Sequence, residues 1–195
     1  VVYEGHSYSS FLIPGLVMMT LAQNAFANSS SSILQSKMNG NIVFMLLAPL
    51  SSLEVYIAFL GAAILRGLIT GGSVLLIASL LVDVEIYSVG LILLFALLAS
   101  GVLGALGIIA GIWSEKYDHL SAFQNFIILP LTFLSGVFFS IQGLSPFWQQ
   151  VSAWNPVFYL IDGFRYGFLG VSDVPYLQSV WVALLFLVML TGISV

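Results

Sequence analysis

Ionisable side chains are scarce in this chain, and their positions allow little catalytic chemistry. The 195 residues include four Lys or Arg, eight Asp or Glu and two His. Metal sites and proton relays need several such groups close together. His6 and His119 fall on opposite sides of the membrane in the topology that the loop charges predict, so they cannot share a metal ion or a proton. Glu115, Lys116 and Asp118 share one short loop, where a solvated charge cluster is a better explanation than a site.

The sequence also lacks the motifs that hold nucleotides or relay protons through an apolar core. It contains no G-x-x-x-x-G-K-[ST] segment, the loop that usually holds nucleotide phosphates. Acidic residues in series along an apolar segment, as expected of a proton-coupled carrier, are absent as well. We therefore expect no catalytic residue, no metal site and no cofactor in this chain.

Arg66 is an exception, because it stands near the middle of a long apolar segment. Placing arginine at the centre of a bilayer costs about 2.5–3.5 kcal/mol on insertion scales, so such a residue usually has a function. The alternative is that the segment is displaced and the side chain reaches the headgroups. The sequence favours neither interpretation and identifies no partner for Arg66.

Composition restricts the chain to one broad class of protein. Hydrophobic residues make up 60% of the chain and charged residues 6%, whereas an average soluble domain has roughly 25% charged residues. The chain must be an integral membrane protein, and because its apolar runs exceed strand length we expect an all-α, polytopic helix bundle. The absence of cysteine excludes disulfides and thiolate metal sites. No basic patch is present, so a nucleic-acid partner is not expected.

Five apolar segments are long enough to cross the lipid bilayer. They cover residues 11–32, 52–81, 88–112, 122–141 and 174–195. The first segment contains Gln23, Asn24 and Asn28, whose amides should face protein or a water-filled path. From Asn28 onward, the end of the helix at the membrane surface is an equally good explanation. Gly107-x-x-x-Gly111 in the third segment predicts close helix packing, within one bundle rather than in a dimer.

Residues 33–53 form the first interruption between apolar segments. They contain Lys37, a predicted turn at Asn39-Gly40-Asn41, a short apolar piece over residues 42–48 and then Pro49. The apolar piece is too short to span, so we interpret it as a helix at the membrane surface or docked on a partner. Ser51-x-x-Glu54 then predicts a capping box that begins the next span.

The segment between the fourth and fifth spans, residues 135–170, is rich in aromatic residues and proline. Such a composition is typical of helices at the membrane interface. Ser145-Pro146 and Asn155-Pro156 each place an N-cap residue before a proline, which predicts two short helices over residues 146–153 and 156–168. Gly170 should end the second helix.

The charges of the short loops predict the orientation. Lys37 and Lys116 lie in the first and third connections and should be cytoplasmic, whereas Glu4 and the acidic turn at residues 82–87 should be outside. The aromatic segment is then outside too. Arg165 is the one basic residue that contradicts this scheme, and an i,i+3 pair with Asp162 would neutralise it.

Three stretches of the sequence resemble the permease subunit of type-2 ATP-binding-cassette exporters. FLIPGLVMM, from Phe11, is similar to the second membrane helix of that family. NGNIVFMLLAPLSSLEV, from Asn39, is similar to its cytoplasmic connection. The third stretch has SGVFF from Ser135, LSP from Leu144, NP from Asn155 and DGFR from Asp162, in the order and spacing of the family. The likeness covers nearly the whole chain.

The resemblance implies a six-span permease that works as a homodimer with two copies of a separate ATPase subunit, in the bacterial inner membrane. Five spans are visible, so we expect one transmembrane permease domain over residues 1–195 that lacks the first span of the family, with a C-terminal boundary left open. ATP and Mg would be held by the partner subunit, and this chain would hold no cofactor. A helix in the cytoplasmic connection would couple the permease to the ATPase, with these expected contact residues: Lys37, Met38, Asn39, Gly40, Asn41, Ile42, Pro49 and Glu54.

The resemblance also implies where substrate passes. The path would lie at the dimer interface, lined by the first and fourth spans visible here, with these candidates: Gln23, Asn24, Asn28, Thr132, Ser135, Phe138 and Phe139. The two outer helices would re-enter the membrane as an outer gate, with these candidates: Trp148, Asn155, Pro156, Asp162 and Arg165. Two other functions stay open, namely an ion-coupled secondary transporter, for which only Arg66 is a candidate, and a noncatalytic membrane assembly protein.

Overall fold

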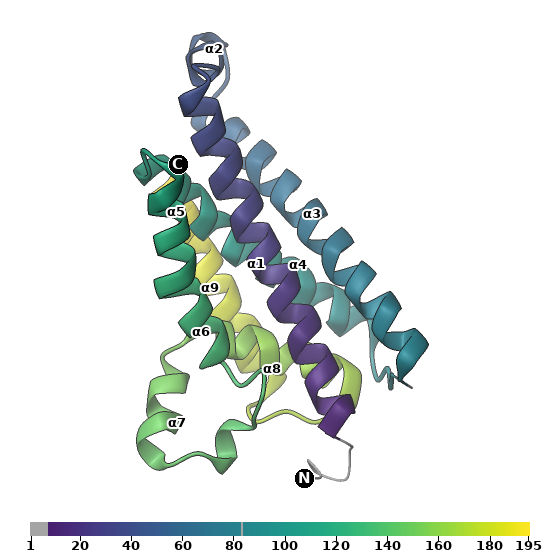
Figure 1. Ribbon diagram of the computed structural model, residues 1–195. Helices are drawn as coiled ribbons and strands as arrows, with labels where there is room; N and C mark the ends of the chain where they lie inside the picture. Colours follow the sequence, from purple (N-terminus) through teal and green to yellow (C-terminus); the bar gives the residue numbers. More distant parts are fainter. Residues whose placement is uncertain (1–7, 83) are drawn as a thin grey trace.

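All regular structure in the described part of the chain is helical, which confirms the predicted all-α bundle. The computed structural model describes residues 8–82 and 84–195 (Figure 1). Glu4, His6 and Asp83, on which part of the predicted topology depends, lie outside the described residues. The elements are α1 (Tyr8–Met38), α2 (Ile42–Leu47), α3 (Ser52–Leu81), α4 (Val89–Trp113), α5 (Tyr117–Phe123), the π turn η1 (Gln124–Ile128), α6 (Leu129–Phe133), the 3-10 turn η2 (Ile141–Gly143), α7 (Pro146–Ala153), α8 (Pro156–Leu169) and α9 (Tyr176–Ser194).

Four of the described helices, α1, α3, α4 and α9, are long and apolar enough to cross a membrane. The centre of the bundle is α4, which packs against α1, α3, α8 and α9. In Figure 1, α1 lies between α3 on one side and the α5–α6 segment on the other. Most of the surface of α3 and α9 is uncovered, as expected for helices that face lipid on their outer sides.

The fourth predicted span is placed differently in the structure. Helix was expected over residues 122–141, but the helical segment begins earlier, at Tyr117, and ends at Phe133. At about 1.5 Å per residue it reaches roughly 25 Å, somewhat less than the hydrocarbon core. It also contains a π turn, in which the Leu129 N–H donates to the Gln124 carbonyl. Pro130 explains this local change of register, because it has no N–H to offer to the preceding turn.

The early end of α6 has a cause that is remote in the sequence. Gly136 adopts φ +79°, which turns the chain away from the helix axis. Carbonyl groups at the end of α6 then accept hydrogen bonds from the outer helices: Asn155 Nδ2 donates to Leu131 O at 2.7 Å and Ser152 Oγ to Leu134 O at 3.2 Å. Because these partners satisfy the last carbonyls, the helix need not continue.

Helix α1 is longer than expected and continues past Ser32 to Met38. Its polar residues do not end it, because Ser29 Oγ donates to the Ala25 carbonyl and Ser30 Oγ to the Ala27 carbonyl within the same helix. Asn28 therefore lies inside the helix rather than at its end.

The short elements follow the sequence closely. Both hydrogen bonds of the Ser51–Glu54 capping box are present at the start of α3. The Asn155 side chain accepts from the Val157 N–H and caps α8, whereas Ser145 makes no such bond to α7. Gly170 ends α8 with φ +70°.

The contact between α1 and α4 depends on glycine. A Cβ on Gly107 would meet the Ser29 side chain and the Phe26 carbonyl, and one on Gly111 would lie 2.8 Å from the Ser30 carbonyl. At this crossing Ser29 Oγ also donates to the Gly104 carbonyl at 2.9 Å. The GxxxG pair is thus used inside the bundle, as the sequence indicates.

Replacing Gly107 by alanine should destabilise the bundle by about 1–3 kcal/mol, because the new methyl group meets backbone that cannot move aside. Thermal unfolding of the purified protein in detergent measures the effect. Gly72→Ala is the matched control, since a Cβ there meets nothing within 4 Å. Equal unfolding midpoints for the two variants would contradict the close packing of α1 on α4.

Candidate functional site

Helix α2 forms an apolar tip at one end of the molecule. It follows a turn in which Gly40 has φ +74°, and it projects beyond the long helices (Figure 1). No residue of α2 is buried, and Phe44, Leu46 and Leu47 are 73%, 79% and 77% exposed. We call the exposed side chains of Val43, Phe44, Leu46 and Leu47 the apolar tip. Contiguous apolar side chains that a protein leaves uncovered mark a surface for another molecule.

Two residues expected to contact a partner form hydrogen bonds within the chain on either side of α2. Lys37 Nζ donates to the Ile112 and Ser114 carbonyls at 2.8 and 2.6 Å, where its charge suits the C-terminal end of α4. The Glu54 carboxylate accepts from the Ser51 N–H at 2.7 Å and from its hydroxyl at 2.8 Å. The other residues assigned to this region are exposed or half-buried: Met38, Asn39, Gly40, Asn41, Ile42 and Pro49.

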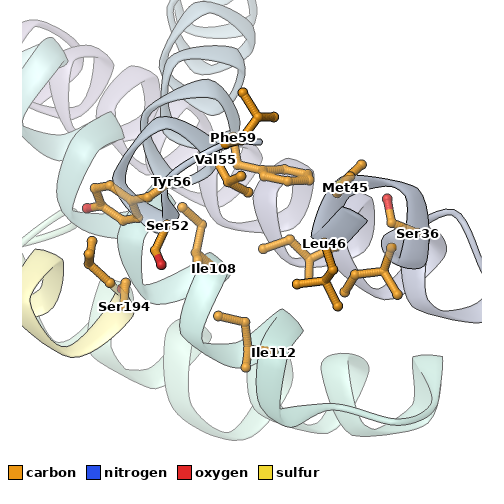
Figure 2. Close-up of a pocket in the computed structure, with 14 residues that line it drawn as sticks. Ser36, Met45, Leu46, Ser52, Val55, Tyr56, Phe59, Ile108, Ile112 and Ser194 are labelled. Atoms are coloured by element: carbon orange, nitrogen blue, oxygen red, sulfur yellow. The ribbon is translucent and has the colours of Figure 1, made fainter. Parts of the chain in front are cut away.

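Between these two anchors, α2 faces a cavity of about 330 Å³. Figure 2 shows Met45 and Leu46 of α2 on one side of this space, Val55, Tyr56 and Phe59 of α3 on another, and Ile108 and Ile112 of α4 opposite. The lining is therefore largely apolar. The segments before and after α2 are thus hydrogen-bonded, whereas α2 itself has no buried residue.

A second surface consists of amide and hydroxyl side chains on α1. Thr20, Asn24, Asn28 and Ser31 recur at spacings of three or four residues, so they occupy one face of the helix, and Gln23 borders this face; all five residues are half-buried. We call this set the polar face of α1. It lies between α6 and α3, because Gln23 Nε2 donates to Thr132 Oγ1 at 3.4 Å and Asn28 Oδ1 accepts from Arg66 Nη1.

Three of the predicted path residues, Gln23, Asn24 and Asn28, lie on the polar face of α1, and Thr132 borders it. The pairing of Asn28 with Arg66 was not predicted, because it depends on where α1 and α3 cross. The remaining candidates lie where the chain turns after α6. Ser135 is buried, with Oγ hydrogen-bonded to the Thr132 carbonyl, and Phe138 stacks on Phe133 at 5.5 Å. Phe139 is half-buried in the same turn.

The outer helices have a polar interior. Arg165 is only 1% exposed, donates from Nη2 to the Gly136 carbonyl at 2.7 Å and places its guanidinium 3.8 Å from the centre of the Phe11 ring. The Asp162 carboxylate accepts from the N–H groups of Asp173 and Val174 at 2.9 and 3.2 Å. The hydrogen bonds of the two side chains go to different segments of the chain, and the i,i+3 pair of Asp162 with Arg165 stays a prediction.

The other two gate candidates have simpler roles. Pro156 begins α8 just after the capping residue Asn155, and Trp148 is half-exposed on α7. The segment that links α8 to α9 joins this network, because the Asp173 carboxylate accepts from Ser140 Oγ at 2.8 Å. The outer region is thus one hydrogen-bonded unit that also contacts the outer end of α1 through Phe11.

Comparison with known proteins agrees with this architecture. The sequence model of the family described as ABC-2 type transporter matches residues 2–169. The chain is 38% identical over 185 residues to the inner membrane transport permease YadH of Escherichia coli K12, a match that covers 95% of this chain and 72% of that protein. It is 27% identical over 173 residues to nodulation protein J of Rhizobium leguminosarum bv. viciae, covering 86% of this chain and 65% of that protein.

These matches confirm the resemblance found in the sequence, and the name of the first relative supports a multi-pass protein of the inner membrane. The description of the family and the name of the Escherichia coli relative both concern membrane transport. The chain belongs to the ABC-2 type transporter family and is a membrane component of a transport system.

Proposed function

We propose that this chain is the transmembrane permease subunit of an ATP-binding-cassette exporter. In this proposal a separate ATPase subunit, which holds ATP and Mg, docks on the apolar tip, and two permease copies form the substrate path between them. The observation that carries it is α2, a short helix that exposes large apolar side chains between two helices, α1 and α3, whose adjoining ends are held by hydrogen bonds.

The anchoring explains how movement of α2 would reach the membrane. Helix α1 continues without a break from the turn before α2 to the outer end of the bundle, where Phe11 contacts Arg165. Lys37 ties the same turn to the end of α4. A displacement of α2 by the ATPase would therefore tilt α1 and α4 together as rigid bodies and would also disturb the outer helices.

The substrate path is proposed along the polar face of α1. Amide side chains facing lipid are unfavourable, so this face should meet a second copy of the chain or water. Its neighbours Thr132 and Arg66 are polar too. The outer helices α7 and α8 would close the far end of the path as a gate.

The proposed orientation places α2 in the cytoplasm and α7 and α8 outside. Lys37 reaches the carbonyl of Ser114, so the first and third connections share one end of the molecule, which is the end that the positive-inside rule assigns to the cytoplasm. Figure 1 shows α7 at the opposite end from α2.

Substituting Leu47 by serine should weaken binding of the ATPase subunit about tenfold or more, because burying a leucine side chain stabilises a contact by about 1.5–3 kcal/mol. Titration of the purified ATPase subunit onto the permease in nanodiscs measures this affinity. Leu81→Ser is the matched control. The two leucines are 77% and 80% exposed, but Leu47 is the last residue of α2, whereas Leu81 is at the far end of α3. The docking assignment fails if both variants bind the ATPase alike.

Cysteine introduced at Asn24 should react with a charged, membrane-impermeant thiol reagent in the assembled permease–ATPase complex. The 195 residues contain no cysteine, so labelling is measured on the separated permease chain, in comparison with the same chain without the introduced cysteine. Two control variants define the possible environments: Leu185→Cys is exposed in the middle of α9, where lipid should exclude the reagent, and Ser30→Cys is buried in α1. Labelling of Asn24→Cys no faster than that of Leu185→Cys would exclude an aqueous path on this face.

A further inference from the structure

Among the described residues of α1, α3, α4 and α9, Arg66 is the one charged side chain that lies in the middle of a helix. It lies near the middle of the 30-residue helix α3, on a surface that is exposed in the single chain. Its Nη1 donates to Asn28 Oδ1, so the guanidinium lies against α1. The side chain therefore lies beside the polar face of α1.

The charge has no acidic partner in the residues that the structure describes, since the neighbour that accepts its hydrogen bond is a neutral amide. A second copy of the chain could not supply a carboxylate at this depth. In a dimer with its two-fold axis along the membrane normal, equivalent residues lie at equal depth. The described acidic residues are at helix starts, in connections or in α8, and none lies in the middle of α1, α3, α4 or α9.

The space beside Arg66 suits a small polar group. Asn24, Asn28, Ser31, Arg66 and Thr70 line a pocket of about 210 Å³ together with Ala27. The hollow is open on one side, so it can take a small polar group while the rest of a larger molecule lies outside it. The pocket thus offers one cation together with hydroxyl and amide groups, surrounded by exposed apolar residues of α3 such as Leu65 and Ile69.

A guanidinium binds phosphate and carboxylate groups with two parallel hydrogen bonds, and the apolar surroundings strengthen such a bond. We propose that Arg66 and Asn28 form a binding site for the anionic group of an amphipathic molecule, phosphate or carboxylate, whose apolar part lies along α3. The inference deepens the proposed function, on which it rests, because it assigns a chemical class to the transported molecule. Asn28 holds the guanidinium in place and does not neutralise it.

Binding of radiolabelled dodecyl phosphate to the complete permease–ATPase complex tests this site. The complex is placed in phosphatidylcholine nanodiscs without nucleotide, so the measurement does not depend on transport or ATP hydrolysis. Dodecyl maltoside has the same alkyl chain as dodecyl phosphate but a neutral headgroup. It serves as the competitor, so its binding measures the contribution of the alkyl chain alone. Folding of every variant is checked by its thermal unfolding midpoint.

Arg66→Gln should lower the affinity for dodecyl phosphate about tenfold or more, and Arg66→Lys by less, because lysine keeps the charge without the two-pronged geometry. Asn28→Asp should also lower it about tenfold, since the new carboxylate pairs with Arg66 while the shape of the side chain is kept. Lys116→Gln is the control, because it removes one exposed positive charge far from the pocket. Unchanged affinity in both Arg66→Gln and Asn28→Asp would overturn the site, as would equal binding of dodecyl phosphate and dodecyl maltoside.

The same system answers two further questions: whether the anion comes from a membrane lipid, and whether the site takes part in transport. Competition by phosphatidylglycerol added to the nanodiscs would identify a membrane lipid as the source, and lack of competition would identify a separate molecule; both results support the anion site. If dodecyl phosphate binds through Arg66 but leaves ATP hydrolysis unchanged, the site stands and the transport role of this face fails.

Discussion

The close contact between α1 and α4 is the constraint on which the other features depend. Gly107 and Gly111 allow the two backbones to meet, and Ser29 adds a hydrogen bond across the contact. In lipid, apolar side chains gain little from leaving their solvent, so such backbone packing replaces the hydrophobic effect as the source of helix association. Because α4 covers one side of α1, the opposite polar side of α1 must face outward from the single chain.

The polar groups of this chain are of two kinds, those that are enclosed and those that are partly exposed. In the outer region, Arg165 and Asp162 are enclosed and hydrogen-bonded to backbone groups of two loops. On the polar face of α1, Gln23 and Asn24 remain half-exposed although the surrounding medium is expected to be lipid. Enclosed groups of the first kind need these hydrogen bonds, since an unpaired buried charge is costly. Groups of the second kind keep part of their surface uncovered in the single chain, which is why we propose that the assembled transporter covers them.

The sequence predicted what local chemistry determines and missed what depends on distant partners. The Ser51–Glu54 capping box, the turn at Gly40 and the end of α8 at Gly170 follow from residues within one turn of each feature, and all are present. The end of α6 was misplaced because its carbonyls are satisfied by Ser152 and Asn155, well beyond the helix. The positions of Lys37 and Arg66 could not be foreseen for the same reason, since each donates to a different helix.

The two uncovered surfaces together indicate that the single chain is one part of an assembly. The apolar tip is unfavourable in water, and the polar face of α1 is unfavourable in lipid, so each surface lies in a medium that does not suit it. They are joined by one unbroken helix, α1, whose end is tied to α4 by Lys37. A partner that covers the tip is thus mechanically connected to whatever covers the polar face. A transporter in which one subunit consumes energy in the cytoplasm and another moves substrate through the membrane needs such a connection.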